Sequence, residues 1–184
     1  NGSDYATGFP NLSADGNTLW FASNRSDGMG GWDIYVSEWT GTTWSTPSNL
    51  GAPLNTPGNE ITPFFDGENL FFSSDYHRGF GGLDVFRAEL QAWQVSNIFH
   101  LGPGVNSSRD DYGFIFDAAD NIGYLTSNRP DGRGNEDIWQ VHKKLDEFVI
   151  TVMDEYRTPI ADAEIDFSAC GAGVMRTNAS GQYS

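Results

Sequence analysis

The sequence predicts an all-β fold made of repeated four-stranded units, a partial β-propeller of three blades. Its composition is rich in aromatic residues and turn formers, with 13 Phe, 7 Tyr, 6 Trp, 22 Gly and 8 Pro among 184 residues. Such a composition favours short strands joined by turns over long helices. One motif also recurs three times along the chain, and each copy divides into four short strand candidates, as the blades of a propeller do.

The repeat consists of an aromatic strand, a polar loop that contains glycine, and a second apolar strand. Its copies are WFASN at 20–24 with GGWDIY at 30–35, FFSSD at 71–75 with GGLDVF at 81–86, and YLTSN at 124–128 with GNEDIW at 134–139. In every copy nine positions separate the residue that opens the loop (Asn24, Asp75, Asn128) from the Asp that closes it (Asp33, Asp84, Asp137). This fixed length predicts a hairpin, because one added residue would turn every following side chain to the opposite face.

The four strands expected in the first copy are Gly8–Leu12, Leu19–Ser23, Asp33–Glu38 and Thr43–Ser48. The repeats themselves are expected at about 4–55, 56–106 and 107–142, so that residues 1–143 form the propeller blades. Three blades do not close a ring. We therefore expect the missing blades upstream in a longer precursor, with completion of the ring by another chain as the alternative.

The glycine loop is predicted to be a structural hairpin device. Glycine at Gly28, Gly30 and Gly31 allows φ > 0 without steric strain. The other copies of the loop carry Gly81, Gly82 and Gly134 at the positions of Gly30 and Gly31. Asp33 and its equivalents are expected to accept hydrogen bonds from loop amides, and Asn24 to do the same at the other end of the loop. Arg25 and Arg129 are available to neutralise the loop Asp residues or a carboxylate of a neighbouring blade.

A calcium site is the sharper alternative for this loop, with Asp27 and Asp33 as candidate ligands. It is less favoured, because the second copy offers no carboxylate between Asp75 and Asp84. Neither a phosphate-binding glycine motif nor a serine or cysteine hydrolase motif is present. Residues 37–44 approximate the Asp-box of sialidases, but Trp39 stands at the position of the aspartate. We therefore expect no cofactor and no catalytic residue here.

The charge balance excludes some classes of partner. Ten basic and 25 acidic residues give a formal net charge of −15, which opposes binding to nucleic acid or to an anionic membrane surface. No apolar run is long enough to span a bilayer. The single cysteine, Cys170, cannot form an internal disulfide.

The aromatic residues fall into two predicted groups. Those at equivalent strand positions in successive repeats are expected to fill the core between blades: Trp20, Phe71, Tyr124, Tyr35, Phe86 and Trp139. Trp39, Trp44 and Trp93 lie towards predicted outer strands or turns. They are the candidates for an exposed interaction surface.

Two segments resemble known families. SADGNTLWFASNR at 13–25, followed by GMGGWDIY at 28–35, resembles the WD-like propeller repeats of the TolB-related class, in the version found in envelope proteins of the Bacteroidetes. The resemblance covers residues 4–142, although Asn135 replaces the second glycine in the third copy. Residues 147–184, with TPIADAEI at 158–165 and TNASGQY at 177–183, are similar to the start of a carboxypeptidase regulatory-like domain of the transthyretin type. This second resemblance implies a truncated β-sandwich segment.

The order of these two segments resembles OmpA-family envelope proteins that end in a peptidoglycan-binding domain, including a kind associated with type IX secretion. The resemblance implies a non-catalytic protein-interaction scaffold on the periplasmic side of the outer membrane. Its implied partners are other cell-envelope proteins, with peptidoglycan reached only through a domain outside these 184 residues. The alternative is a carbohydrate-active or peptidase-associated enzyme whose catalytic residues lie outside this fragment.

Overall fold

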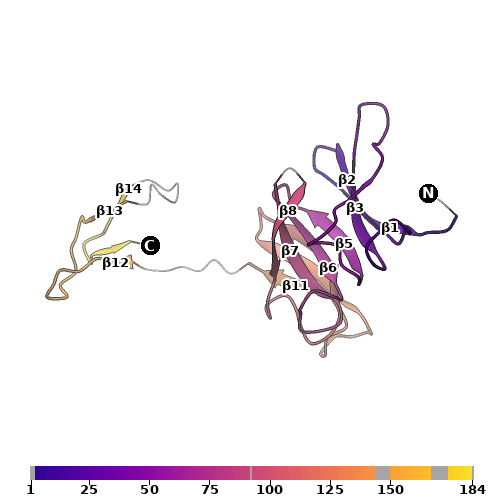
Figure 1. The fold of residues 1–184 in the computed structure, drawn as a ribbon. Coiled ribbons are helices and arrows are strands. Elements are labelled where there is room, and N and C mark those ends of the chain that lie inside the picture. Colours follow the sequence, from indigo (N-terminus) through magenta and orange to yellow (C-terminus); the bar gives the residue numbers. More distant parts are fainter. Residues whose placement is uncertain (1–2, 92, 144–149, 167–173, 184) are drawn as a thin grey trace. The chain divides into compact units, whose positions relative to one another are not determined.

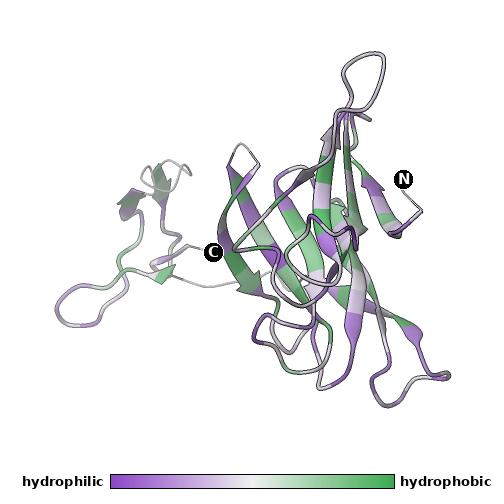
Figure 2. Ribbon diagram, turned by 45° about the vertical axis from the view of Figure 1, so that its right-hand side comes forward, coloured by the Kyte–Doolittle hydropathy of each residue, from purple (hydrophilic) through white to green (hydrophobic). Residues whose placement is uncertain are grey.

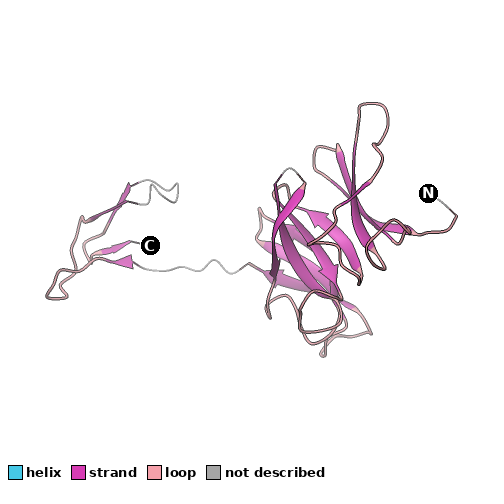
Figure 3. Cartoon of the chain, in the orientation of Figure 1, coloured by secondary structure: helices cyan, strands magenta, loops and turns pink. Residues whose placement is uncertain are grey.

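The protein is all-β, as the composition predicts. A computed structural model describes residues 3–91, 93–143, 150–166 and 174–183. Strands account for 48% of the described residues, which form no helix (Figure 3). There is accordingly no helix in the described part that could cross a membrane. The chain divides into two compact units, residues 1–143 and 144–184.

The first unit contains three antiparallel sheets, one for each copy of the repeat (Figure 1). Sheet 1 has the strand order β1-β2-β3-β4, sheet 2 the order β5-β6-β7-β8 and sheet 3 the order β11-β10-β9. Their bounds are β1 Thr7–Leu12, β2 Thr18–Ser23, β3 Asp33–Glu38, β4 Ser48–Asn49, β5 Glu60–Phe65, β6 Asn69–Ser74, β7 Asp84–Gln91, β8 Gln94–His100, β9 Asp111–Asp117, β10 Ile122–Ser127 and β11 Asp137–His142. None of the sheets closes on itself.

The first two repeats form four strands each, as predicted, but the fourth strands differ from the prediction in the first and third repeats. The fourth strand of the first repeat, expected at Thr43–Ser48, is reduced to Ser48–Asn49 and an isolated bridge between Trp39 and Trp44. A tight turn connects the two bridged residues, and in it the Thr40 amide donates to the Thr43 carbonyl at 2.9 Å. After the bridge, Pro47 has no amide hydrogen for a ladder. The third repeat forms only three strands among the described residues.

Neighbouring sheets of the first unit share apolar cores, and apolar residues form bands along their strands (Figure 2). The first core joins Trp20 and Ile34 of sheet 1 to Phe72 and Phe86 of sheet 2. The second core joins Phe71 and Val85 of sheet 2 to Phe114 and Leu125 of sheet 3. Sheet 2 is therefore covered on both faces, which explains why its strands carry apolar residues at consecutive positions.

The face of sheet 3 that points away from sheet 2 is uncovered by the rest of the first unit. Ile115, Tyr124 and Ile138 lie on it, and Ile138 is 79% exposed. The assignment of Tyr124 to the core is therefore wrong, because no described sheet of this unit packs against the face it occupies. Trp20, Phe71 and Phe86 lie in these cores, as predicted, and Trp139 packs against the second core. Tyr35 is buried but lies outside both cores, stacked on Phe21, so its assignment to the core between blades is wrong.

The second unit contains two short antiparallel strand pairs. β12 (Ile150–Thr151) pairs with β15 (Gln182–Tyr183), and β13 (Glu164–Asp166) pairs with β14 (Val174–Arg176), both antiparallel. Cys170 and residues 147–149 and 184 of the predicted sandwich segment lie outside the described residues.

Candidate functional site

The Asp that closes each glycine loop accepts hydrogen bonds from amides of the same loop, the role predicted for it. Asp33 accepts from the Met29 amide. Asp84 accepts from the amides of Phe80 and Gly81 at 3.0 and 2.9 Å. Asp137 accepts from Arg133 and Gly134 at 2.7 and 3.0 Å. The carboxylates therefore hold the loops in shape, which leaves less of their hydrogen-bonding capacity for a ligand.

The residue that opens each loop has a different role from the one predicted. The side chain of Asn24 accepts from the Ala6 amide at 2.6 Å, and that of Asp75 from the Asn59 amide at 2.7 Å. Asn128 accepts from the Asp110 amide at 2.9 Å. In each repeat this side chain therefore fixes the segment before the first strand instead of its own loop.

The loop glycines are required by close packing and not by positive φ. Gly28, Gly30 and Gly31 are absent from the residues with left-handed backbone, which corrects the prediction. A Cβ on Gly30 would lie 2.2 Å from the Thr56 carbonyl oxygen, and one on Gly81 would lie 1.9 Å from the Arg109 carbonyl oxygen. The backbone of the next repeat occupies the space that a side chain would need.

Backbone hydrogen bonds join each of the first two loops to the repeat that follows it. The Gly31 amide donates to the Gly58 carbonyl at 2.7 Å, and the Glu60 amide donates to the Trp32 carbonyl at 2.6 Å. The Asp111 amide donates in the same way to the Leu83 carbonyl at 2.7 Å. The first two glycine loops therefore attach each repeat to the next one through backbone hydrogen bonds.

The third loop has no repeat to dock against among the described residues. A Cβ on Gly134 would lie 3.5 Å from its nearest neighbour, the Glu136 carbonyl oxygen, which is ordinary contact. Asn135 stands where the first two loops have their second glycine. Asn135 therefore replaces glycine in the one of the three loops whose remaining glycine, Gly134, has open space beside it.

Two buried asparagines, Asn55 and Asn106, also stabilise the segments that connect the repeats, and no structural role was predicted for them. Asn55 accepts from the Ile34 amide at 2.8 Å and donates to the Ile34 carbonyl at 2.9 Å. Asn106 makes the same pair of bonds to Val85, at 2.7 and 2.9 Å. The sequence signal that could have identified them is their repetition: each asparagine lies four residues after a glycine, Gly51 or Gly102, in equivalent places of two repeats.

Two buried acidic residues begin the first strands of sheets 2 and 3. Glu60 accepts from the Thr56 hydroxyl at 2.6 Å and from the Ser74 hydroxyl at 2.7 Å. Burial raises the pKa of the Glu60 carboxyl, and these hydrogen bonds oppose the rise. Asp111 instead forms an ion pair with Arg129, at 2.5 Å.

The ion pairs predicted for the loop Asp residues are wrong. Arg129 pairs with Asp111 of its own repeat and not with Asp137. Arg25 lies over the ring of Tyr35, with its guanidinium carbon 4.5 Å from the ring centroid, and 5.0 Å from that of Tyr5. It thus stacks on aromatic rings at the free face of sheet 1.

The two calcium candidates do not assemble a metal site. One Asp33 oxygen is used by the loop amide and by the Asn49 amide group, at 3.1 Å from the latter. Asp27 accepts from the Tyr35 hydroxyl at 3.4 Å. Within the described ranges, no group of three or more His, Cys, Asp or Glu side chains lies close enough together to hold a metal.

The three candidate tryptophans separate into two environments. Trp39 and Trp44 are 40% and 36% exposed and meet edge to face, with centroids 5.5 Å apart. Trp93 instead packs against the first core, 5.2 Å from the ring of Trp20, and its indole donates to Glu38. Its assignment to an exposed surface is wrong, because the longer β7–β8 hairpin folds it over the edge of the core.

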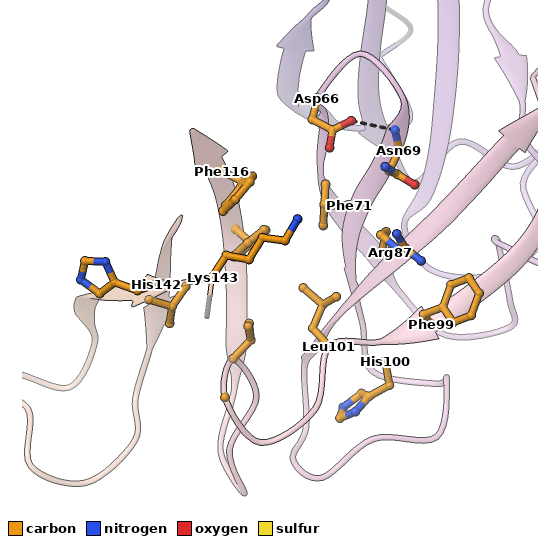
Figure 4. A pocket seen from close by; sticks show the side chains of 14 residues that line it. Asp66, Asn69, Phe71, Arg87, Phe99, His100, Leu101, Phe116, His142 and Lys143 are labelled. Carbon is orange, nitrogen blue, oxygen red and sulfur yellow. Dashed lines mark hydrogen bonds between the residues drawn. The ribbon is translucent and has the colours of Figure 1, made fainter. Parts of the chain in front are cut away.

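A pocket of about 470 Å³ opens between sheets 2 and 3 (Figure 4). Its walls are mainly apolar, and it carries four basic or titratable nitrogen groups but one carboxylate. The lining residues are Asp66, Asn69, Phe71, Arg87, Phe99, His100, Leu101, Gly104, Val105, Phe114, Phe116, Val141, His142 and Lys143. Asp66 is engaged by the amides of its own turn, at 2.9 Å from Glu68 and 2.7 Å from Asn69. The pocket therefore combines apolar walls with two cationic side chains, Arg87 and Lys143.

Comparison with family models and with curated proteins gives no relative. The chain matches no model of a known protein family. A search of curated proteins also finds no match.

Proposed function

We propose that the three sheets are consecutive blades of a partial β-propeller and that the chain belongs to a non-catalytic interaction scaffold. One observation carries this proposal. Ile115, Tyr124 and Ile138 on the uncovered face of sheet 3 occupy the repeat positions of Phe64, Phe71 and Val85, which pack in the core between sheets 2 and 3. An end face with core-type residues fits an array that continues with another blade.

The use of the loop and strand carboxylates supports a non-catalytic role. Asp84 and Asp137 are bound by loop amides, while Glu60 and Asp111 are bound by neighbouring side chains and amides. Catalytic acids and bases need a proton that substrate can reach, and these groups are held by backbone. The recurring polar motif is explained by assembly of the repeats.

The location follows from the resemblance of the repeat motif. We place the scaffold in the bacterial cell envelope, on the periplasmic side of the outer membrane, in a protein of the OmpA-family type. The second unit, with its two short antiparallel pairs, is proposed as the start of a carboxypeptidase regulatory-like sandwich. Peptidoglycan contact would come through a further domain.

The Trp39 and Trp44 pair is the proposed contact surface for a protein partner. Paired, partly exposed tryptophans offer apolar area with little conformational entropy to lose on binding. Their backbone bridge and the Thr40–Thr43 turn fix their positions before a partner arrives.

Crosslinking tests this function. The full chain would be crosslinked in an outer-membrane and periplasmic extract, and the captured proteins identified by mass spectrometry. We expect defined envelope proteins whose capture falls strongly with Trp39→Ala plus Trp44→Ala. The control is Tyr156→Ala, which removes an aromatic ring of 81% exposure from the second unit. Capture unaffected by the double variant, or turnover of glycan or peptide substrates by the chain, would contradict the proposal.

A further inference from the structure

The outer edge of sheet 3 lacks the strand that the other sheets have. In sheets 1 and 2 the third strand pairs on both sides, β3 with β2 and β4, and β7 with β6 and β8. The equivalent strand β11 pairs only with β10 among the described residues. An unpaired strand edge is a template for the addition of another strand.

The backbone of β11 lacks the partners that satisfy its counterparts. The Ile34 carbonyl accepts from the Leu50 amide and from Asn55, and the Val85 carbonyl accepts from the Leu101 amide and from Asn106. Ile138 occupies the same position, and no hydrogen bond to its outward amide or carbonyl arises from the described residues. Within the described ranges these groups have no partner, so an added strand could pair with them.

The pocket between sheets 2 and 3 lies beside this edge. Phe116 of sheet 3 lies on one side of it, and Phe99 and Leu101 of the second repeat lie on the other (Figure 4). Val141 of sheet 3 also lines the pocket. β8 shows how a fourth strand is placed: its His100 and Ile98 stand opposite Phe86 and Ala88. A strand paired with β11 in the same manner would stand opposite Trp139 and Val141, next to the pocket.

Charge distinguishes the pocket from the rest of the chain. Only ten of the 184 residues are Lys or Arg, yet Arg87 and Lys143 both line the pocket. Arg87 already pairs with Glu89 at 3.3 Å and lies over the ring of Phe99. Lys143 points into the pocket and has no ion pair with any described residue (Figure 4). This ammonium group is available for an anionic ligand group.

We propose that the β11 edge and this pocket form an acceptor site for an extended strand of a partner protein. The strand carries apolar side chains at alternate positions, which enter the pocket, and a carboxylate, which meets Lys143. Main-chain pairing with β11 supplies affinity, and the pocket supplies selectivity, as in other strand-addition sites. This inference concerns a different surface from the tryptophan pair and does not depend on the proposed envelope role.

Peptide binding to the full chain tests the site. The probe is the fluorescein-labelled peptide GSTVTVE with a free C-terminus, measured by fluorescence anisotropy. We expect saturable binding, weakened about tenfold or more in GSTTTTE, which lacks the valines, and in GSTVPVE, which lacks a central amide hydrogen. Lys143→Glu should weaken binding by about fivefold or more, while Arg133→Glu, the same charge change on an exposed distant loop, should leave it unchanged.

Hydrogen exchange decides whether the peptide occupies the strand edge. Added GSTVTVE should slow exchange of the 137–142 amides, and GSTVPVE should not. Equal binding of all three peptides, or binding without protection of β11, would overturn the proposal. Protection of β11 in the free monomer would assign the edge to the chain itself, and protection only in a dimer detected by sedimentation would assign it to a second copy. Either result would also overturn the proposal.

Discussion

Buried carboxylates are the distinctive residues of the first unit. Asp33, Glu60, Asp84 and Asp111 are buried, although a carboxylate loses hydration when it leaves water. Each is held by amides, hydroxyls or an arginine of its own repeat. Since these partners exist only when loop and strand are folded together, the acids couple local loop structure to the packing of the sheet.

Glu60 should make stability depend on pH. Its pKa is raised by burial, so the folded chain binds its proton more tightly than the unfolded chain does. The resulting stability is present below the unfolded pKa and is lost as pH rises through the folded pKa. Urea unfolding between about pH 4 and pH 7 should show the wild type losing stability with rising pH relative to Glu60→Gln. Glu68→Gln, in an exposed turn, controls for removal of one charge; parallel profiles for wild type and Glu60→Gln would contradict this expectation.

Asn106 should contribute strongly to stability, because its side chain pairs with both the amide and the carbonyl of Val85. Asn106→Ala leaves the Val85 amide without its acceptor and removes one donor from the Val85 carbonyl. We expect a loss of about 2 to 4 kcal/mol in the free energy of unfolding, because buried backbone groups would remain unpaired. The Asn97 side chain is exposed and donates to Glu89, so Asn97→Ala should cost less than about 0.5 kcal/mol in the same urea titration. Equal losses would show that burial of the asparagine adds nothing.

At the scale of elements, the sequence predicted what is local and missed what is contributed by distant segments. The nine-residue spacing correctly predicted the hairpin loops and the role of Asp84, because both concern residues within one loop. It could not show that Arg109 of the next repeat lies against Gly81, since that contact depends on how sheets pack. Trp93 was misplaced for the same reason: nothing near it in the sequence indicates the Trp20 ring that covers it.

The glycine loops should differ in their tolerance of a methyl group. Gly81→Ala places Cβ 1.9 Å from the Arg109 carbonyl oxygen, so two repeats must separate locally. We expect a loss of about 2 kcal/mol in the free energy of unfolding. Gly134→Ala occupies the equivalent position in the open third loop and should change stability by less than about 0.5 kcal/mol. Chemical denaturation of both variants measures the difference, and a large loss for Gly134→Ala would mean that something covers the third loop in solution.

At the scale of the whole molecule, the repeated sequence produces repeated surfaces, and only the inner ones are covered. Phe71 meets Phe114 across the second core, at 5.1 Å between ring centroids. The equivalent positions on sheet 3 retain apolar side chains but have no partner sheet within the first unit. Apolar residues at equivalent repeat positions therefore contribute differently to the free energy of unfolding, because the hydrophobic contribution depends on the surface that a residue removes from water.

This difference gives a test of whether the sheet 3 face is free in solution. Phe71→Ala removes a buried ring and should lower the free energy of unfolding by about 3 to 5 kcal/mol. Ile138→Ala removes a side chain that is 79% exposed and should change it by less than about 0.5 kcal/mol. Urea unfolding at two protein concentrations, with sedimentation to report the oligomeric state, measures both effects. A loss of about 2 kcal/mol for Ile138→Ala that grows with protein concentration would mean that copies of the chain cover this face, since association stabilises only the folded state. The same loss without concentration dependence would mean that another part of the chain covers it.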